Sequence, residues 1–375
     1  MERSADVLII GGGVIGLTAA YFLAREGVLL EIVDKGDFGQ EASWAGAGIL
    51  PPGNPARART PFDQLRAHSA ALYPTLSAEL RERTGIDNGY LRCGGLEFIG
   101  EAAEAADQEW RGEGIAFEAL DGKALARLEP ALATGLGTAY HLPDMAQVRN
   151  PRHLKALLAG CRSRGVRLRP GCPVLGFERS GGRVRAAKTV AGPLPAGRFL
   201  LTAGAWTGPL LEPFGWRPGV RPVRGQIALL HTGAPLFRHV VLWGARYLVP
   251  RPDGRVLVGS TEEDAGFDKR TTAGAIADLL ALAGTLVPGL AEAHLERCWA
   301  GLRPGSPDGM PFLSPVPGCD NVFVAAGHFR AGIQLSPATG LVMKELLLGQ
   351  PLTVPLAPFR LDRAPVPLHQ PAFPS

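Results

Sequence analysis

The sequence predicts a mixed α/β protein, in which a parallel sheet built from separate stretches of the chain is combined with an antiparallel sheet. Two observations predict this fold class. Three short apolar segments, at residues 6–10, 198–203 and 321–326, each run into a glycine turn. Between them lie longer strand-like segments with polar turns, at residues 90–99 and 241–261. Short apolar runs are typical of buried parallel strands, whereas hairpin signals indicate antiparallel ones.

The N-terminal stretch is the clearest part of the predicted parallel sheet. Residues 6–10 form an apolar strand, and three glycines, Gly11 to Gly13, follow as a tight turn. Residues 14–26 are apolar nearly all round, as expected of a helix packed under a sheet. Gly27 is placed to end that helix, and residues 29–33 form the next strand.

Two later segments repeat the pattern of a strand followed by glycine. Residues 198–203 end in Gly204, and residues 321–326 end in Gly327. After the second segment, Ser336-Pro337 is predicted to be the N-cap and first residue of a helix that runs to Leu348. We therefore expect the three stretches to share one sheet.

The remaining strand-like segments predict a second domain that is inserted twice into the first. Asp253-Gly254 is a hairpin signal between residues 248–250 and 256–259. At about 100–200 residues per domain, a chain of 375 residues is expected to hold two. The predicted cofactor domain comprises residues 1–85, 143–215 and 298–375, and the predicted substrate domain residues 86–142 and 216–297.

Composition excludes several classes of protein. A hydrophobic fraction of 46% and a charged fraction of 20% are ordinary for a globular protein. The five scattered cysteines form no CxxC pair, so neither a zinc site nor a disulfide framework is expected, and no metal is predicted. The net charge of +4 comes without a run of like charges, so no nucleic-acid surface is expected. We find no signal peptide or membrane-spanning stretch, and we expect a cytoplasmic protein with a proline-rich terminus after Arg363 that is flexible or lies on the surface.

The glycine turn at the N-terminus has the spacing of a dinucleotide-binding fingerprint. Gly11 permits a tight turn, Gly13 lets the backbone approach a pyrophosphate, and Gly16 lets helix and strand pack closely. The helix N-terminus supplies free N–H groups for phosphate. Asp34, 18 residues after Gly16, ends the next strand and can accept hydrogen bonds from a ribose diol. The alternative is a purely structural glycine turn, and the fingerprint does not distinguish NAD from FAD.

Further motifs resemble a known family. The segments DVLIIGGGVIGLTAAYFLAREG, ASWAGAGIL, LLTAGAW, YLVPRPDGRVLVGSTEEDAGFD, WAGLRPGSPDGMP, FVAAGHFRAGIQLSPATG and FRLDR occur in this order along the chain. In order and content they resemble D-amino-acid-oxidase-type flavoproteins, and most of all the glycine oxidases of thiamine-thiazole biosynthesis. The resemblance covers essentially the whole chain. It implies FAD as the cofactor, in a discontinuous Rossmann-like domain joined to a substrate domain on an antiparallel sheet.

The resemblance also implies which residues bind FAD. Residues of the fingerprint are expected at the pyrophosphate and ribose. Small residues are expected along the flavin, where the backbone must approach a flat ring, and Val174 is expected to contact the adenine. The run from His328 wraps the isoalloxazine, with the following helix aimed at its pyrimidine edge. The implied set is Gly11, Gly13, Val14, Ile15, Gly16, Asp34, Lys35, Ala42, Ser43, Gly46, Ala47, Gly48, Ile49, Val174, Gly204, His328, Phe329, Arg330, Ala331, Gly332, Ile333 and Gln334.

Three residues are predicted to handle the substrate. Arg303 matches the family arginine that binds the substrate carboxylate, a task for which a planar guanidinium is suited. Arg330 matches a second active-site arginine, and Tyr247 a tyrosine that closes over the carboxylate. The alternatives are an arginine on the surface or in an internal salt bridge, and a tyrosine of the core. His328 is expected to shape the flavin site and not to act as a base, since an amine can lose hydride without one.

The chain departs from the family pattern at three places. Ala245 stands where some glycine oxidases have a pocket histidine, and Glu262 stands where an apolar residue can occur. Both positions are expected to face the substrate and therefore leave the identity of the amine open. The stretch SPDGMPF lacks the cysteine to which flavin is attached in sarcosine-oxidase relatives, so noncovalent FAD is predicted.

The resemblance implies oxidation of glycine to an imine, with dioxygen reduced to hydrogen peroxide. The imine is hydrolysed to glyoxylate and ammonia, or passes to a thiazole synthase as a possible partner. Sarcosine, D-proline, D-alanine or another small amine stays open as the substrate, and a quinone as the acceptor. A flavin-binding module without turnover is the alternative from another class. A homo-oligomer, either a dimer or a tetramer, is expected by resemblance.

Overall fold

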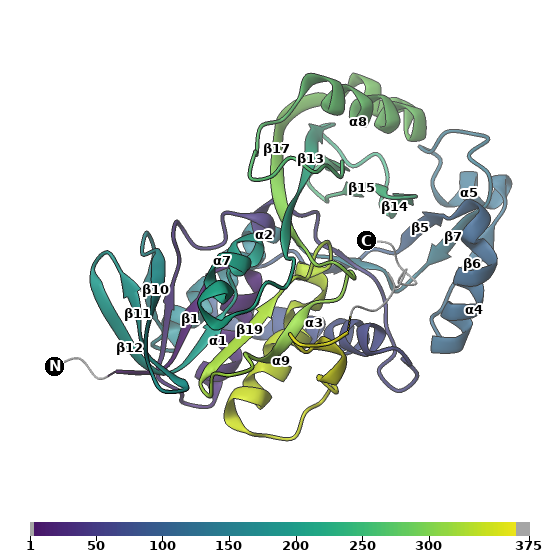
Figure 1. The fold of residues 1–375 in the computed structure, drawn as a ribbon. Coiled ribbons are helices and arrows are strands. Elements are labelled where there is room, and N and C mark those ends of the chain that lie inside the picture. Colours follow the sequence, from purple (N-terminus) through teal and green to yellow (C-terminus); the bar gives the residue numbers. More distant parts are fainter. Residues whose placement is uncertain (1–3, 365–375) are drawn as a thin grey trace.

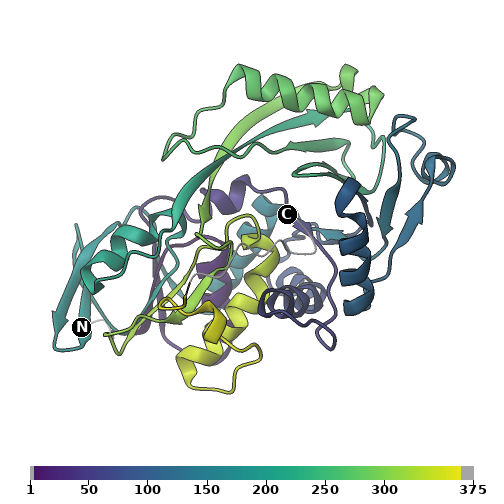
Figure 2. The ribbon, with the colours of Figure 1, turned by 45° about the vertical axis from the view of Figure 1, so that its right-hand side comes forward.

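The computed structural model describes residues 4–364 and contains two large sheets, each of eight strands within that range. Figure 1 shows the first sheet with its helices in the lower part of the molecule and the second sheet above and to the right. Figure 2, turned by 45°, shows the long helix α8 (Ala273–Leu286) lying over the outer face of the second sheet. The predicted mixed α/β fold class is confirmed. Most of the predicted proline-rich tail, residues 365–375, lies outside the described residues.

The first sheet joins the three predicted stretches. β1 is parallel to β2 and to β12, and β12 is parallel to β19. The helices α1, α3, α6 and α9 enclose a core with this sheet. The strands are β10 (Val174–Ser180), β11 (Arg183–Thr189), β12 (Gly192–Leu201), β1 (Ala5–Ile10), β2 (Leu30–Val33), β9 (Arg167–Arg169), β18 (Phe312–Pro315) and β19 (Val322–Ala326); the helices are α1 (Val14–Arg25), α3 (Pro61–Thr84), α6 (Asn150–Ser163) and α9 (Gly332–Leu348).

Glycine is required at two positions where β1 leads into α1. Gly11 has a φ of +115°, and a Cβ there would overlap the backbone of Thr202 at the end of β12. At Gly16 a Cβ would overlap the carbonyl oxygen of Gly11. The two glycines therefore let the helix pack directly against the turn, as the fingerprint predicts.

The second sheet is antiparallel except at one pair of strands. β15 and β16 form the predicted hairpin around Gly254, whose φ is +77°. β14 pairs with β5 in parallel, which the hairpin signals did not predict. Alternate residues face two apolar clusters, one of them beneath α8. The strands are β17 (His294–Gly305), β13 (Arg221–His231), β16 (Arg255–Gly259), β15 (Arg246–Pro250), β14 (Val240–Trp243), β5 (Gly95–Phe98), β7 (Ala139–Leu142) and β6 (Glu118–Leu120).

Short elements connect the two sheets. A small third sheet contains β3 (Ile49–Leu50), β8 (Ala146–Gln147) and β4 (Leu91–Arg92). β13 and β17 pair along eleven registered positions, and Figure 1 shows them extending from the second sheet toward the first. β17 runs across the predicted domain boundary at residue 298. The proposed division into domains thus stays a prediction. The remaining helices are α2 (Ala42–Ala45), α4 (Ala103–Glu113), α5 (Gly122–Leu128) and α7 (Thr207–Leu211).

The predicted start of the last helix is wrong. α9 begins at Gly332, not after Ser336, and Pro337 lies inside it. Proline has no N–H, so the carbonyl of Ile333 loses its helical partner. The hydroxyl of Tyr73, on α3, donates to this carbonyl, and Ser336 Oγ donates to it over 3.0 Å. A residue distant in sequence thus stabilises Pro337 inside the helix, although the local sequence predicts that a helix begins there.

We expect Tyr73→Phe to lower the free energy of unfolding by about 1–2 kcal/mol, the cost of losing one buried hydrogen bond. The Tyr73 ring stacks on Tyr90, and that contact survives the substitution. Tyr90→Phe is the matched control, because the described residues show no hydrogen bond from the Tyr90 hydroxyl. Thermal unfolding of the FAD-loaded variants measures both effects. Equal melting temperatures for the two variants would contradict the role of the Tyr73 hydroxyl.

Three further findings concern the described part of the chain. Within residues 4–364, no helix combines the length and apolar character needed to cross a membrane. The five cysteines all carry free thiols. In the same range, His, Cys, Asp and Glu side chains form no group of three or more that could hold a metal ion.

Candidate functional site

Two adjoining cavities lie where strands of the first sheet end. The larger has a volume of about 350 Å³ and is lined by Ile10, Asp34, Thr202 and Ala326, at the carboxyl ends of β1, β2, β12 and β19. Ligands of open α/β sheets bind at this edge. The smaller has a volume of about 90 Å³ and lies between the first sheet and the second. Both cavities are lined by Ala42, Gly46, Arg303, Arg330 and Ile333.

The N-terminus of α1 faces the larger cavity. Gly13 is its N-cap and has no side chain to cap the first turn. Val14 N donates to Ser43 Oγ over 2.9 Å, while the next amides of the first turn have no helical acceptor. Free N–H groups at a helix N-terminus bind phosphate, and both Gly13 and Ser43 line the cavity.

Asp34 lies at the far end of the same cavity. Its carboxylate accepts from Gly12 N over 2.7 Å and from Gly36 N over 3.0 Å, and it has further lone pairs for a ligand hydroxyl. Burial raises the pKa of Asp34, although the two amides oppose this effect. Next to it, the Lys35 ammonium lies over the ring of Trp206, 3.2 Å from its centroid. The aromatic and cationic surface here suits the adenosine end of a dinucleotide.

The run from His328 to Gln334 separates the two cavities. His328 is buried, its Nε2 lies 3.1 Å from Thr339 Oγ1, and burial lowers its pKa to about 3. Phe329 has a φ of +47°, a strained conformation for a side chain of this size that is found at functional sites. The N-terminus of α9 follows directly, and Gly332 lines the larger cavity. Because its pKa is about 3, His328 is neutral at ordinary pH.

The larger cavity fits a flavin adenine dinucleotide by its donor set. It combines first-turn amides of α1 that have no helical acceptor, the carboxylate of Asp34, and glycines at which the backbone is open to the ligand. A Cβ at Gly13, which lines this cavity, would meet only Ser43 Oγ, 3.2 Å away. Gln334 Oε1, buried beside the smaller cavity, has no hydrogen-bond partner among the described residues and is open to a ligand N–H.

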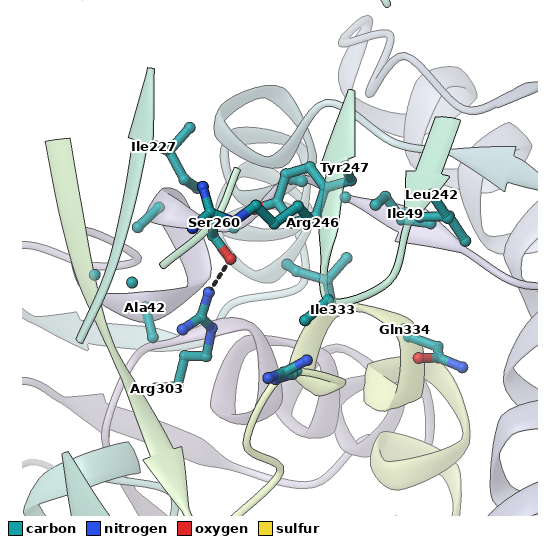
Figure 3. Close-up of a pocket in the computed structure, with 18 of the residues that line it drawn as sticks. Ala42, Ile49, Ile227, Leu242, Arg246, Tyr247, Ser260, Arg303, Ile333 and Gln334 are labelled. Atoms are coloured by element: carbon teal, nitrogen blue, oxygen red, sulfur yellow. Dashed lines mark hydrogen bonds between the residues drawn. The ribbon is translucent and has the colours of Figure 1, made fainter. Parts of the chain in front are cut away.

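Arg303 projects from β17 into the smaller cavity. Its Nη1 donates to the Thr261 carbonyl over 3.0 Å. Its Nη2 donates to Ser260 Oγ, the bond drawn in Figure 3. Gly225, on the neighbouring strand β13, leaves the space that the guanidinium fills, because a Cβ there would overlap it. No carboxylate of residues 4–364 forms a salt bridge with Arg303. Burial, with the nearby charge of Arg330, lowers its pKa.

Tyr247 projects from β15 into the same cavity. Burial raises the pKa of its hydroxyl, while the charge of Arg303 acts in the opposite direction. The phenol is therefore protonated at neutral pH and is a hydrogen-bond donor. Gly259, opposite on β16, has no side chain to displace the ring. Arg303 and Tyr247, far apart in sequence, thus lie in one cavity.

The two positions that depart from the family pattern lie on different sides of the site. Ala245 lines the smaller cavity, at the turn between β14 and β15. Glu262 is not among the residues that line it, but its Oε2 forms an ion pair with Arg330 Nη2. Glu262 therefore acts on the site through Arg330.

Arg251 was not predicted from the sequence. It is buried, donates to the Ala47 carbonyl over 2.7 Å and the Val148 carbonyl over 3.2 Å, and also contacts Gln147 Oε1. Burial lowers its pKa to about 10. It holds the small-residue segment around Ala47 against β8, and the motif YLVPRPDG contains it without indicating this role.

The structure brings nearly all predicted site residues to the two cavities. Gly16 and Ala331 are the exceptions: Gly16 packs against the turn, and Ala331 lies in the apolar core. Their predicted contact with the cofactor stays a prediction, as do the roles of the others. Cavity residues that were not predicted include Cys172, Pro173, Thr202, Ala203, Trp206, Gly225, Arg246 and Ser260. Several of them are sequence neighbours of predicted residues such as Val174 and Gly204. This adjacency is the feature of the sequence that could have indicated them.

Comparison with known proteins gives consistent matches. A family model described as FAD dependent oxidoreductase (DAO) matches residues 6–346. A glycine oxidase of Pseudomonas putida is 39% identical over 358 residues, covering 95% of this chain and 98% of that protein. The crystal structure of glycine oxidase from Geobacillus kaustophilus has a TM-score of 0.91 at 34% identity, covering 96% of this chain and 99% of that one. A Synechocystis protein named bifunctional protein ThiO/ThiG is 36% identical over 361 residues, covering 93% of this chain and 52% of that protein.

Proposed function

This chain belongs to the FAD dependent oxidoreductase (DAO) family, and from that premise we propose that it is an FAD-dependent amino-acid oxidase whose substrate is glycine. The family resemblance predicted from the sequence is confirmed, as is FAD dependence. The reaction converts glycine, dioxygen and water into glyoxylate, ammonia and hydrogen peroxide. The amine loses two electrons and dioxygen gains them.

The observation that carries the proposal is the pairing of Arg303 and Tyr247 in a small cavity that adjoins the dinucleotide cavity. Arg303 has an uncompensated charge in a site largely shielded from water, where a carboxylate is bound most strongly. Tyr247 donates a further hydrogen bond to the same carboxylate. A volume of about 90 Å³ favours a small amino acid.

The chain's own residues orient the substrate. Bound FAD would supply the acceptor for the two electrons that the amine carbon loses, with dioxygen as the final oxidant. Arg303 and Tyr247 hold the carboxylate, which fixes the direction of the Cα–H bond. Neither His328 nor Tyr247 serves as a base. Burial lowers the pKa of His328 to about 3, so its imidazole is a weak base, and its Nε2 is bonded to Thr339. The Tyr247 phenol is protonated at neutral pH.

Anaerobic mixing with glycine tests the proposal. We expect the flavin absorbance to bleach, and to recover with release of hydrogen peroxide when air is admitted. Bleaching only by sarcosine, D-proline or D-alanine would move the substrate and keep the oxidase. Bleaching without recovery in air would indicate another electron acceptor, such as a quinone. Protein that is folded and FAD-loaded but unreactive toward all these amines would contradict the proposed activity.

We further propose a thiazole synthase as a partner and a homo-oligomer as the active form. The support for the partner is the bifunctional ThiO/ThiG protein, in which a part similar to this chain shares one polypeptide with another part. A pull-down with purified thiazole synthase tests the first, and light scattering the second. A monomer at working concentration would contradict the oligomer.

A further inference from the structure

The charges around the smaller cavity are not balanced by a single substrate carboxylate. Three arginines line it: Arg246, Arg303 and Arg330. No aspartate or glutamate lines it among the described residues. Arg330 is paired with Glu262, just outside. Two cationic groups thus remain for a substrate that, with its amine neutral, brings one negative charge in the case of glycine.

Arg246 is the group left without a counterpart. Within residues 4–364 its guanidinium forms no hydrogen bond and no ion pair, whereas Arg303 holds Thr261 and Ser260. Arg246 is the first residue of β15 and follows the turn at Gly244 and Ala245. It lines the cavity, and Figure 3 shows it above, with Arg303 projecting from below.

The position of Arg246 is at the open end of the cavity. Gly244 and Ala245, which line the same part, are exposed, whereas Gly225, Ile227 and Gly301 are buried at the inner end. A ligand with its carboxylate on Arg303 therefore extends any second group toward Arg246. Glu262 already occupies Arg330, so that arginine is not available to a second anion without loss of the ion pair.

We propose that Arg246 is a specificity-determining residue that binds a second anionic group, so that the site accepts small amino acids with two negative charges. This inference rests on the proposed amine oxidation. The second carboxylate is carried by a substituent on the amine nitrogen, as in iminodiacetate, or by the side chain on Cα, as in D-aspartate. For iminodiacetate the reaction consumes dioxygen and water: a C–N bond is broken, the amine is oxidised by two electrons, and glycine, glyoxylate and hydrogen peroxide are formed.

Pairs of substrates that differ only in charge test the inference. Iminodiacetate is compared with its neutral monoamide, and D-aspartate with D-asparagine, by the kcat/KM of the FAD-loaded enzyme. We expect the charged member of at least one pair to be favoured about tenfold to a hundredfold, the range for one hydrogen bond between charged groups. Arg246→Met should reduce that preference to about threefold or less. Arg246→Lys should retain part of it, and added salt should weaken it because Arg246 is partly exposed.

Arg238→Met is the matched control, because Arg238 is exposed, lies shortly before β14 and lines neither cavity. It should leave the charge preference of the wild type in place. An equal preference in wild type and Arg246→Met, or no preference in either pair, would overturn the inference while glycine turnover continues. Loss of turnover with glycine and all other amines would instead contradict the proposed function itself. Flavin absorbance shows whether each variant is folded and loaded.

Discussion

Arg303→Met should lower kcat/KM for glycine at least about a hundredfold while FAD stays bound. A hydrogen bond between charged groups contributes about 1.5–3 kcal/mol, and the upper value corresponds to roughly 150-fold. Loss of orientation at the reacting carbon adds to this effect. Burial of the guanidinium strengthens the bond, because little water screens it. Steady-state kinetics measure the loss in kcat/KM, and the flavin spectrum of the purified variant shows whether FAD stays bound.

Two variants separate substrate binding from a structural effect. Arg303→Lys keeps the charge but loses the planar fork, so we expect an intermediate kcat/KM. Arg297→Met changes an exposed arginine on the same strand, β17, that lines neither cavity, and it should stay within about twofold of the wild type, as is usual for surface substitutions. Unchanged kinetics in Arg303→Met, with FAD bound, would remove Arg303 from the substrate site.

Gly13→Val should give a folded protein that does not bind FAD. Gly13 has a φ of −75° and a ψ of −175°, which valine adopts readily, and a Cβ there meets only Ser43 Oγ at 3.2 Å. The protein therefore tolerates the side chain, but the added methyl groups occupy the space from which the α1 amides would reach a pyrophosphate. The absorbance of the purified protein, before and after incubation with excess FAD, measures the loss. Circular dichroism confirms folding.

Other glycines provide the contrast for Gly13→Val. Gly16→Val should fail to fold, because a Cβ there overlaps the Gly11 carbonyl and Thr202 Oγ1. Gly112→Val, on α4, introduces the same side chain where no atom lies within 4 Å, and it should bind FAD normally. A Gly13→Val protein that carries a full complement of flavin would contradict the place assigned to the pyrophosphate.

Glycine was the feature that made the first sheet predictable. β1, β12 and β19 each end within three residues of a glycine with positive φ, and these glycines can be read directly from the sequence. The start of α9 was not predictable in this way. Ser336-Pro337 has the local pattern of a helix N-terminus, and the sequence around it does not show that the Tyr73 hydroxyl, from α3, donates to the carbonyl that Pro337 leaves without a helical partner. The parallel pairing of β14 with β5 likewise depends on a long-range contact and on no local signal.

The site was predictable where a residue acts by its own chemistry. Arg303 and Tyr247 carry functional groups that bind a carboxylate, and both lie in the smaller cavity. Arg251 and Gly225 act through another part of the chain: the first holds the Ala47 carbonyl, and the second leaves room for a guanidinium. Such roles depend on the packing of two sheets. Arg246 was missed for another reason, since its lack of a partner among the described residues is visible only in three dimensions.

The parallel pairing of β14 with β5 also has a consequence for biosynthesis. Gly95 pairs with Val240, and β12 pairs with both β1 and β19, so neither sheet can be completed from a continuous stretch of nascent chain. During translation, β5 leaves the ribosome long before its neighbour exists, with an open edge exposed meanwhile. Contacts of such high sequence separation slow folding and favour transient intermediates. We therefore expect both sheets to form only after most of the chain has been synthesised. Until then, the strands made early have no partners and are prone to aggregation.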